Sequence, residues 1–333
     1  MKHRKLGANG PSVGALGLGC MGMSPDWYRG ADEAESIATI QAATDAGMTL
    51  LNTGDFYGMG HNEMLIGRAI AGRREQVFIS VKSGLMRAPD GQPVGFDTRP
   101  AAVKNFVTYS LRRLGTDYID LYQPARIDPV VPIEDTVGAI ADLVTAGYVR
   151  YIGLSEAGPA SLARAHAVHP ITALEIEYSL MGRGIERNIL PAARARGIGI
   201  VAYNVLAGGL LGGCIAAGGL PAGDFRAHMP RFAAGNLERN LKLVSRLAGL
   251  AQRLNATPAQ LAVAWVLAQG PDIVPLVGAR TRERLHDAIG ALDLSLDAAA
   301  IDEAQRCVPQ DAVAGSLYGG HVQDSIDRER STQ

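Results

Sequence analysis

The stretch VKNFVTYSLRRLGTDYIDLYQ, at positions 103–123, shows the unit from which the chain is built. Its first part carries the apolar residues Val103, Val107 and Leu114 at the spacing of a helix that buries one face. Its last part, 117–123, is a short run rich in apolar residues. The stretch therefore predicts a helix followed by a buried strand.

Similar runs recur along the chain with helical segments between them, so strands are expected at 13–20, 49–53, 76–83, 117–123, 149–156, 171–179, 197–204 and 272–278. Apolar strands that alternate with helices are typical of a parallel sheet covered on both faces. Eight such units favour a closed (β/α)8 TIM barrel over an open sheet. A small hairpin with its turn at Asn9-Gly10 is expected before the barrel. Thr257, Pro258 and Gln260 have the spacing of a capped helix start.

The composition predicts one domain over residues 1–333, including a tail at 309–333. With 47% hydrophobic residues and no linker-like stretch, the chain is expected to fold around one large core. A formal net charge of −1 with dispersed Arg and Lys argues against nucleic acid or an anionic membrane as a partner. No apolar run is long enough for a membrane span, which predicts a cytoplasmic protein. Cys20, Cys214 and Cys307 lack metal-site or disulfide spacing, so reduced thiols are expected.

The glycine-rich segment 51–63 follows the second expected strand and carries Tyr57, while Lys82 lies near the end of the third. In a barrel, the carboxyl ends of neighbouring strands meet at the same mouth, where active sites lie. An ammonium within about 4–6 Å of a phenol favours the phenolate and lowers the phenol pKa. The pair is therefore a candidate proton donor to a carbonyl oxygen near neutral pH. Taken alone, the pair is also compatible with a loop tyrosine and a strand-end lysine that have no catalytic role, and the pattern by itself favours this interpretation slightly.

The motifs that surround this pair resemble the aldo-keto reductase superfamily, in particular its bacterial, pyridoxal-reductase-like branch. They run in family order across almost the whole chain: GLGCMGM at 17–23, NTGDFYGMGHNE at 52–63, LRRLGTDYIDLY at 111–122, GLSE at 153–156, EYSL at 177–180, VAY at 201–203 and PLVGAR at 275–280. The resemblance implies a (β/α)8 barrel that reduces a small aldehyde or ketone with NADPH and without metal, as a monomer or homo-oligomer.

The family's catalytic tetrad of Asp, Tyr, Lys and His is matched at only two positions. Tyr57 takes the place of the proton donor and Lys82 that of the residue that tunes it. Asn52 stands where the family has its aspartate, and Ala125 where it has its histidine. An amide cannot pair with an ammonium as a carboxylate does, so Lys82 is expected to be less firmly held. Arg126, next to Ala125, is a candidate substrate contact.

Asn52 leads to a testable expectation with two outcomes. If Lys82 lacks a carboxylate partner, the substitution Asn52→Asp should raise turnover and leave NADPH affinity nearly unchanged. A loss of activity would instead mean that another acid, Asp55 or Glu175, supplies the charge.

The cofactor is expected at the eighth strand, where Gly278, Ala279, Arg280 and Arg284 surround a helix start capped by Thr281. Backbone N–H groups and two arginines suit the 2′-phosphate of NADPH. The resemblance adds cofactor contacts at Gly22, Met23, Ser155, Tyr203, Leu206 and Asp287. It also adds Glu156 and Glu175, which replace the family's Asn and Gln. The interior charge of Glu175 has to be paired or neutralised.

Substrate choice is expected in the loop with Trp27 and Tyr28 and in the tail with Leu317 and Tyr318, which is predicted to fold over the barrel mouth. Two functional classes fit these residues. One is an NADPH-dependent carbonyl reductase that also runs in reverse, which Tyr57 and Lys82 favour. The other is a low-turnover or inactive NADP(H)-binding barrel that acts as a redox sensor or subunit, which Asn52 and Ala125 favour.

Overall fold

The protein forms a closed barrel of eight parallel strands in a computed structural model that describes residues 1–24, 32–213, 215, 220, 224–319 and 327. Around the barrel the strands follow chain order, and β12 pairs with β3 to close the ring. The expected (β/α)8 barrel is thereby confirmed. Its strands are β3 (Gly17–Gly19), β4 (Leu50–Gly54), β5 (Phe78–Ser83), β8 (Ile119–Pro124), β9 (Val149–Ser155), β10 (Ile171–Glu177), β11 (Gly199–Tyr203) and β12 (Ile273–Val277).

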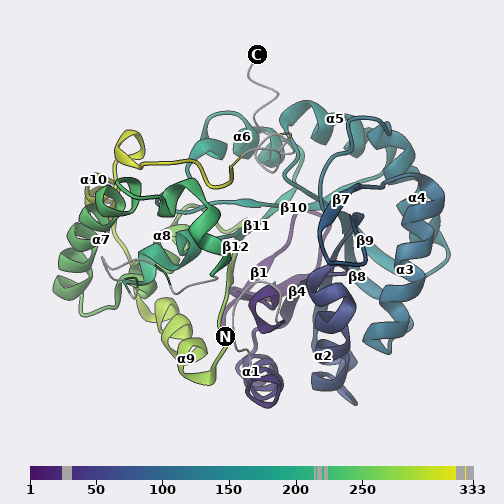
Figure 1. The fold of residues 1–333 in the computed structure, drawn as a ribbon, viewed down its shortest axis with the longest axis horizontal. Helices are drawn as coiled ribbons and strands as arrows, with labels where there is room; N and C mark the ends of the chain where they lie inside the picture. Colours follow the sequence, from purple (N-terminus) through teal and green to yellow (C-terminus); the bar gives the residue numbers. More distant parts are fainter. Residues whose placement is uncertain (25–31, 214, 216–219, 221–223, 320–326, 328–333) are drawn as a thin grey trace.

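Helices surround this barrel, as Figure 1 shows. α3 ends where Gly115 adopts a φ of 63° and its N–H reaches the carbonyl of Leu111. The expected start of α8 is confirmed, since Thr257 and Gln260 form a reciprocal capping box. The described helices are α1 (Glu33–Asp45), α2 (His61–Ala69), α3 (Pro100–Leu114), α4 (Ile133–Thr145), α5 (Pro159–Val168), α6 (Ile189–Arg194), α7 (Asn236–Arg253), α8 (Pro258–Ala268), α9 (Arg282–Ile289) and α10 (Ala298–Cys307).

The expected N-terminal hairpin consists of β1 (His3–Lys5) and β2 (Ser12–Gly14), and it closes the amino end of the barrel. Leu6 and Val13 pack with the interior side chains of β4, β5 and β8. Gly7, at a φ of 72°, lies so close to β10 that a Cβ would come 2.4 Å from the carbonyl oxygen of Thr172. Arg4 fixes the hairpin by donating to the carbonyls of Gly270 and Ile273, at 2.6 Å each.

Inside the barrel, side chains form an apolar layer near the hairpin and a polar layer near the opposite end. The apolar layer contains Leu50, Phe78 and Leu121. Two residues further along the same strands come Asn52, Ser80 and Gln123, all buried. Because alternate residues of a strand face the same side, each strand contributes to both layers. The polar layer therefore lies at the carboxyl ends of the strands.

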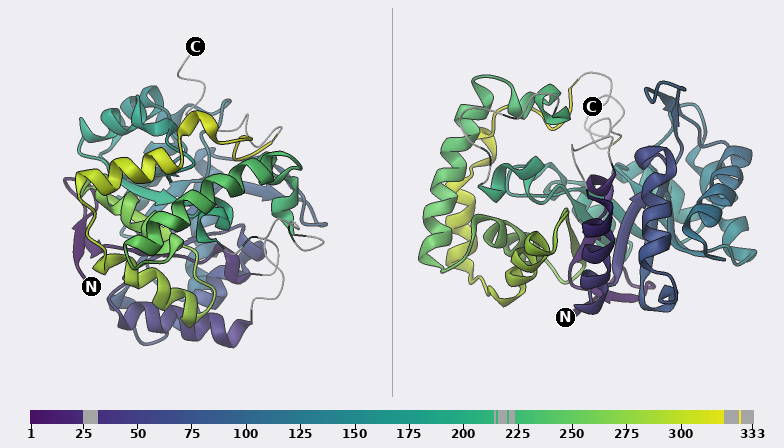
Figure 2. Two further views of the ribbon diagram at one scale, coloured as in Figure 1. Left: turned by 90° about the vertical axis from the view of Figure 1, so that its left-hand side faces the viewer. Right: turned by 60° about the horizontal axis from the view of Figure 1, so that its bottom comes forward.

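Three features differ from the expected element plan. The run at 13–20 is split, with β2 in the hairpin and β3 in the barrel. A second hairpin, β6 (Leu85–Arg87) with β7 (Pro93–Phe96), follows β5. Between β11 and β12 the described residues form two α-helices, α7 and α8, and α7 packs against α10 outside the barrel (Figures 1 and 2).

Candidate active site at the carboxyl ends of the strands

A tight loop between β4 and α2 presents Tyr57. Gly58 and Gly60 adopt φ angles of 58° and 97°, which glycine tolerates best. A Cβ at Gly58 would lie 3.0 Å from Cβ atoms of Ser24 and His61, so this turn has no room for a larger residue. The buried side chain of Asn62 holds the loop, because it accepts from the Thr53 hydroxyl at 2.7 Å and donates to the Cys20 carbonyl at 2.8 Å.

Lys82, from the adjacent strand β5, lies directly beside Tyr57. Its ammonium is 5.2 Å from the centre of the Tyr57 ring and hydrogen-bonds the phenol. Strand register explains the approach, since Lys82 pairs with Gly54 just before the loop. Both side chains are buried. The expected proximity of the two residues is confirmed.

Lys82 also has a carboxylate partner, contrary to the expectation drawn from Asn52. The ammonium lies 2.9 Å from Oε1 of Glu175 and donates to Oδ1 of Asn52 at 2.7 Å. The Asn52 amide in turn donates to Oε2 of Glu175 at 2.7 Å. Glu175 extends from β10 across the barrel interior to reach β4 and β5. The expectation of a Lys82 without a carboxylate is wrong, because the charge comes from a distant strand.

Burial and nearby charges act on both members of the Tyr57–Lys82 pair. Burial alone lowers the pKa of Lys82, but Glu175 and Tyr57 outweigh it, so that the pKa is raised. Burial raises the pKa of Tyr57, Lys82 opposes this effect, and Glu175 adds to it. The pKa of the phenol is therefore raised, not lowered as the ammonium alone predicts. The protonated phenol, the form that can donate, predominates at neutral pH.

Asp55, the other acid considered as a partner of Lys82, does not take that role. In the described part of the chain, Glu175 is the carboxylate within 4.0 Å of the Lys82 ammonium. Asp55 instead lies near the ion pair that joins the buried Glu63 of α2 to Arg113 of α3. Burial and the Glu63 charge raise the pKa of Asp55 to about 8, against the opposing effect of Arg113.

At the end of β8, Ala125 is buried and provides no imidazole at this position. The guanidinium of Arg126 donates to the Ala125 carbonyl at 2.6 Å. Burial lowers the pKa of Arg126, but the neighbouring groups, Tyr203 and Tyr318 foremost, raise it overall. Tyr57 is also among these neighbours, so Arg126 lies near the candidate proton donor.

The start of α9 has the expected form. Thr281 caps the helix by accepting from the N–H of Arg284 at 3.3 Å. Arg280 lies close enough to Asp224 to lower the pKa of that carboxyl, although Arg226 has the larger effect. Arg284 is exposed. Asp287 accepts a hydrogen bond from the Thr257 hydroxyl at 3.1 Å, so this carboxylate already serves the α8 cap.

The remaining expected cofactor residues line the same end of the barrel. Gly22 and Met23 form a turn after β3, Ser155 ends β9, Tyr203 ends β11, and Leu206 begins the next turn. Glu156 adopts a φ of 54°, which is uncommon outside glycine, and accepts from the N–H of Glu177 at 3.0 Å. Trp27 and Tyr28 lie outside the described residues.

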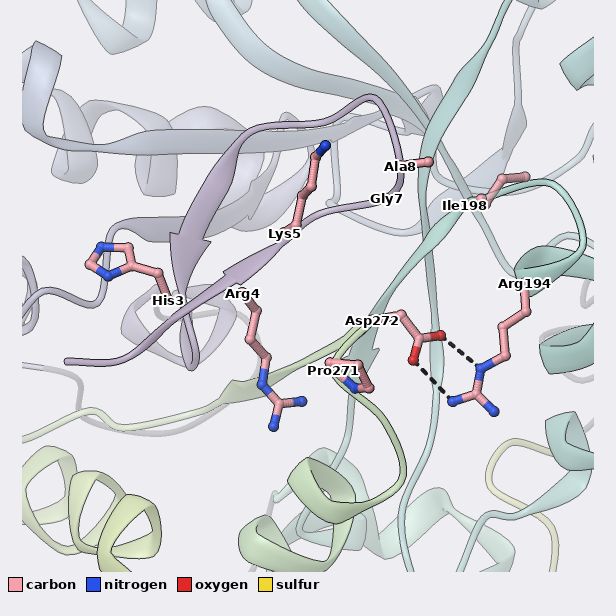
Figure 3. A pocket seen from close by; sticks show the side chains of 10 residues that line it. His3, Arg4, Lys5, Gly7, Ala8, Arg194, Ile198, Pro271 and Asp272 are labelled. Carbon is pink, nitrogen blue, oxygen red and sulfur yellow. Dashed lines mark hydrogen bonds and ion pairs between the residues drawn. The ribbon is translucent and has the colours of Figure 1, made fainter.

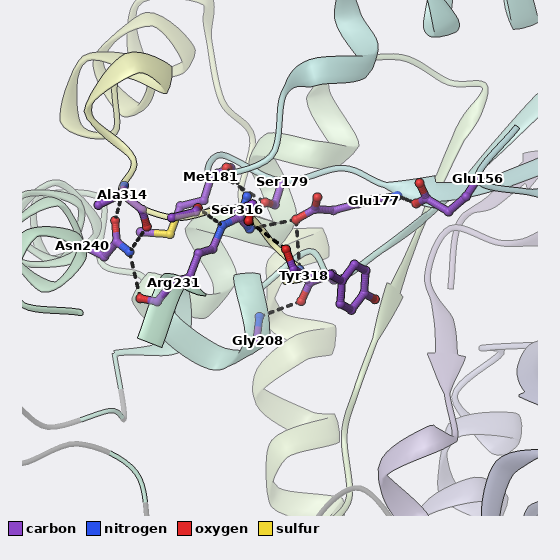
Figure 4. Close-up of polar contacts among 12 residues, drawn as sticks. Glu156, Glu177, Ser179, Met181, Gly208, Arg231, Asn240, Ala314, Ser316 and Tyr318 are labelled. Atoms are coloured by element: carbon purple, nitrogen blue, oxygen red, sulfur yellow. Dashed lines mark hydrogen bonds and ion pairs between the residues drawn. The ribbon is translucent and has the colours of Figure 1, made fainter. Parts of the chain in front are cut away.

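The tail reaches the mouth, as expected from its sequence. The Tyr318 phenol hydrogen-bonds Tyr203, and Asp327 accepts from the N–H of Gly158 at 2.7 Å. Figure 4 shows Asn240 bridging this tail to the segment that carries Arg231, whose guanidinium lies 2.8 Å from Glu177. The sequence analysis missed Arg231, because it lies in an irregular segment between β11 and α7.

Sequence reasoning also missed Gln123 and Ser80, which complete the network around Glu175. Gln123 donates to Glu175 at 2.5 Å and to the Ser80 hydroxyl at 3.3 Å. Strand alternation could have identified Ser80, because it lies two residues before Lys82 and faces the same side.

A hollow of about 530 Å³ lies at the opposite end of the barrel, beside the hairpin. Figure 3 shows it between Arg4 and Lys5 of the hairpin and the ion pair of Arg194 with Asp272, whose atoms are 2.8 Å apart. This is the amino end of the strands, where barrels keep stabilising contacts rather than catalytic groups.

The described residues lack the features of two other classes of function. No helix among them is long and apolar enough to cross a membrane. They also contain no group of three His, Cys, Asp or Glu side chains that could hold a metal ion.

A closed (β/α)8 barrel with a buried tyrosine and lysine at its mouth is the arrangement that the motifs imply for an aldo-keto reductase. The sequence matches the aldo/keto reductase family over residues 15–309. It is 43% identical over 316 residues to the probable aldo-keto reductase 1 of Glycine max, which covers 94% of this chain and 91% of that protein. The chain therefore belongs to the aldo/keto reductase family.

Solved structures of this family have the same fold. The glycerol dehydrogenase AKR11B4 from Gluconobacter oxydans has a TM-score of 0.82 at 29% identity, over 92% of this chain and 96% of that one. The holo form of the aldo-keto reductase AKR11C1 from Bacillus halodurans has a TM-score of 0.78 at 27% identity, over 96% and 99% of the two chains. Family membership supports an oxidoreductase that reduces carbonyl compounds, and the family generally uses NADH or NADPH.

Proposed function

We propose that this protein reduces an aldehyde or ketone to the alcohol with NADPH, and that Tyr57 supplies the proton. The observation that carries the proposal is the buried Lys82 ammonium, which lies between the Tyr57 phenol and the Glu175 carboxylate. Such a cation stabilises the phenolate that forms when the proton leaves.

The chemistry divides between the cofactor and the side chains of the mouth. A bound reduced nicotinamide supplies the hydride. Tyr57 donates its proton to the carbonyl oxygen, and Lys82 holds the phenol and balances the charge that develops on it. Arg126, buried on the same side of the mouth, contacts the substrate in place of the missing imidazole.

The residues around α9 fit a phosphate-bearing cofactor. A helix start with two nearby arginines provides N–H donors and positive charge, as a 2′-phosphate requires. Thr281 caps this helix, and Arg284 extends into solvent from its first turn. This donor set is the reason for proposing NADPH over NADH.

The test measures NADPH oxidation with a panel of aldehydes, quinones and pyridoxal. Tyr57→Phe should lower the rate by about 10²–10⁴, because the general acid is lost. Tyr109→Phe is the matched control, since Tyr109 is exposed on α3, and it should leave the rate unchanged. Equal rates in the wild type and in Tyr57→Phe would contradict the proposed role of Tyr57.

The buried Ala125 favours a second candidate, an NADP(H)-binding barrel with little turnover that acts as a redox sensor or subunit. Without an imidazole at position 125, the carbonyl lacks the hydrogen-bond donor that this position provides in the family. Tight NADPH binding measured by fluorescence, together with no oxidation of NADPH by any member of the panel, would support this candidate.

A further inference from the structure

We infer that Glu175 is the positioning carboxylate of this site, which holds the Lys82 ammonium against Tyr57 and supplies the charge that position 52 lacks. The inference rests on the proposed function in one respect. The expected effect of Glu175 on turnover requires that Tyr57 is the proton donor, whereas the contact of Glu175 with Lys82 does not. It gives β10 a part in the proton-transfer machinery, and it changes the expected effect of substitutions at position 52.

Contacts from three strands define the arrangement. Glu175 Oε1 lies 2.9 Å from the ammonium, while Glu175 Oε2 accepts from the Asn52 amide at 2.7 Å and from the Gln123 amide at 2.5 Å. Lys82, Asn52 and Glu175 are each at most 5% exposed. A buried ion pair with satisfied hydrogen bonds is firmly held, because removing either charge leaves the other unpaired.

The order of donors and acceptors fixes the charge of Glu175. An ammonium has only donors, so the oxygen of the Asn52 amide must face Lys82 and its nitrogen must face Glu175. Oε2 of Glu175 thus receives two amide donors, and Oε1 receives the ammonium. Both oxygens therefore act as acceptors in this network, as those of an ionised carboxylate do. Glu175 is therefore the ionised partner, and Asn52 is a neutral bridge.

This arrangement of donors and acceptors explains why Asn52→Asp or Glu175→Gln alone should disrupt the hydrogen bonds around Lys82. Asn52→Asp places a second carboxylate oxygen 2.7 Å from Oε2 of Glu175, so two like charges share one ammonium. Glu175→Gln leaves Lys82 without a carboxylate, and the new amide nitrogen then meets the Asn52 nitrogen, donor against donor. Each variant should lower kcat by at least tenfold.

The double variant Asn52→Asp/Glu175→Gln should restore the hydrogen bonds around Lys82, with the carboxylate at position 52 and the amide at position 175. Asp and Asn have the same shape, as do Gln and Glu, so the carboxylate moves from β10 to β4 while the packing is unchanged. The amide nitrogen introduced at position 175 then faces the carboxylate introduced at position 52. Gln123 can turn its amide to present its oxygen, which is otherwise unpartnered among the described atoms. We expect kcat to recover to within about fivefold of the wild-type value.

The pH profile separates this role from a merely structural one. Carbonyl reduction needs the protonated phenol, so the rate falls as pH rises through the apparent pKa of Tyr57. Removing the negative charge in Glu175→Gln lowers that pKa and moves the alkaline limb to lower pH by about one unit. Asn52→Asp adds negative charge and should move the limb upward. The double variant should return it to the wild-type position.

A readout independent of turnover is the near-ultraviolet absorbance of tyrosinate, measured as the difference between each protein and its Tyr57→Phe counterpart. Glu175→Gln should ionise Tyr57 at lower pH than the wild type. If the wild type reduces no carbonyl but the tyrosinate titration shifts as expected, the proposed function fails and the assignment of Glu175 stands.

Melting temperature serves as the control, and it should stay close to wild type in the double variant. Wild-type kcat and an unshifted tyrosinate titration in Glu175→Gln would overturn the inference. So would a double variant in which the two losses of kcat multiply instead of cancelling, since independent sites behave additively in free energy.

Discussion

At the scale of single residues, Asp55 is a carboxyl group that the fold buries beside another acid. Its pKa of about 8 exceeds the value of about 3.9 for an unfolded chain. The folded protein then binds a proton that the unfolded chain releases, and stability declines as pH rises between these two values. The decline is about 1.4 kcal/mol per pH unit within that interval.

The substitution Asp55→Asn should remove this decline. We expect the variant to gain stability relative to the wild type as pH rises from 5 to 8, and thermal melting at several pH values measures this gain. Asp97→Asn is the control, because hydrogen bonding to Arg99 lowers the pKa of Asp97, which is therefore ionised over this whole range. A constant difference between Asp55→Asn and wild type would show that Asp55 does not titrate there.

The proximity of Tyr57 and Lys82 was predictable because they belong to neighbouring strands, whose order in a parallel barrel follows the chain. The partner of Lys82 was not predictable between Asp55 and Glu175, because β10 is separated from β5 by two other strands. Residue types and spacing do not tell which interior side chain crosses a barrel. That choice depends on side-chain length and on the register of every strand between the two residues.

At the scale of elements, the arginines and N–H groups at the start of α9 lead us to predict which cofactor the protein prefers. NADPH should bind at least tenfold tighter than NADH, which corresponds to about 1.4 kcal/mol. Arg280→Ala and Arg284→Ala should each weaken NADPH binding and leave NADH binding nearly unchanged, because only NADPH carries the 2′-phosphate. Fluorescence titration measures both affinities.

Arg282 offers a matched control on the same helix, since its guanidinium is already paired with Glu35 at 2.9 Å. Arg282→Ala should leave the preference for NADPH intact. Equal affinities for the two cofactors in the wild-type protein would remove the phosphate-site assignment.

Elements with a strong repeating pattern were predictable, and short irregular ones were not. The eight strand runs and the cap of α8 follow from apolar spacing and from Thr257 with Gln260. The β6–β7 hairpin was not predicted, because its strands contain only three and four residues and are little buried. The split of the run at 13–20 escaped because Ala15 and Leu16 are buried too, so no polar residue marks the change from hairpin to barrel.

At the scale of the whole molecule, the two ends of the barrel have different tasks. Leu6 is fully buried between the N-terminal hairpin and the apolar layer at the amino end of the barrel, whereas Tyr57 follows the carboxyl end of β4. Leu6→Ala should cost about 2–5 kcal/mol of unfolding free energy, as measured by urea denaturation, and leave kcat unchanged. Val130→Ala, at an exposed position, is the control and should change neither quantity. A fall in kcat of the folded Leu6→Ala protein would show that the ends are coupled.

The pairing of Leu276 with Gly17 closes the ring, and it has a consequence for the growing chain on the ribosome. On one side, β3 has no partner strand until β12 is synthesised, 259 residues later (276 minus 17). At about 5–20 residues per second, this wait lasts roughly 13–52 s. During that time the free edges of the first and last finished strands and the apolar side chains near the N-terminal hairpin stay open to other molecules. Nascent chains halted before β12 should accordingly recruit chaperones, and chains released after β12 should not.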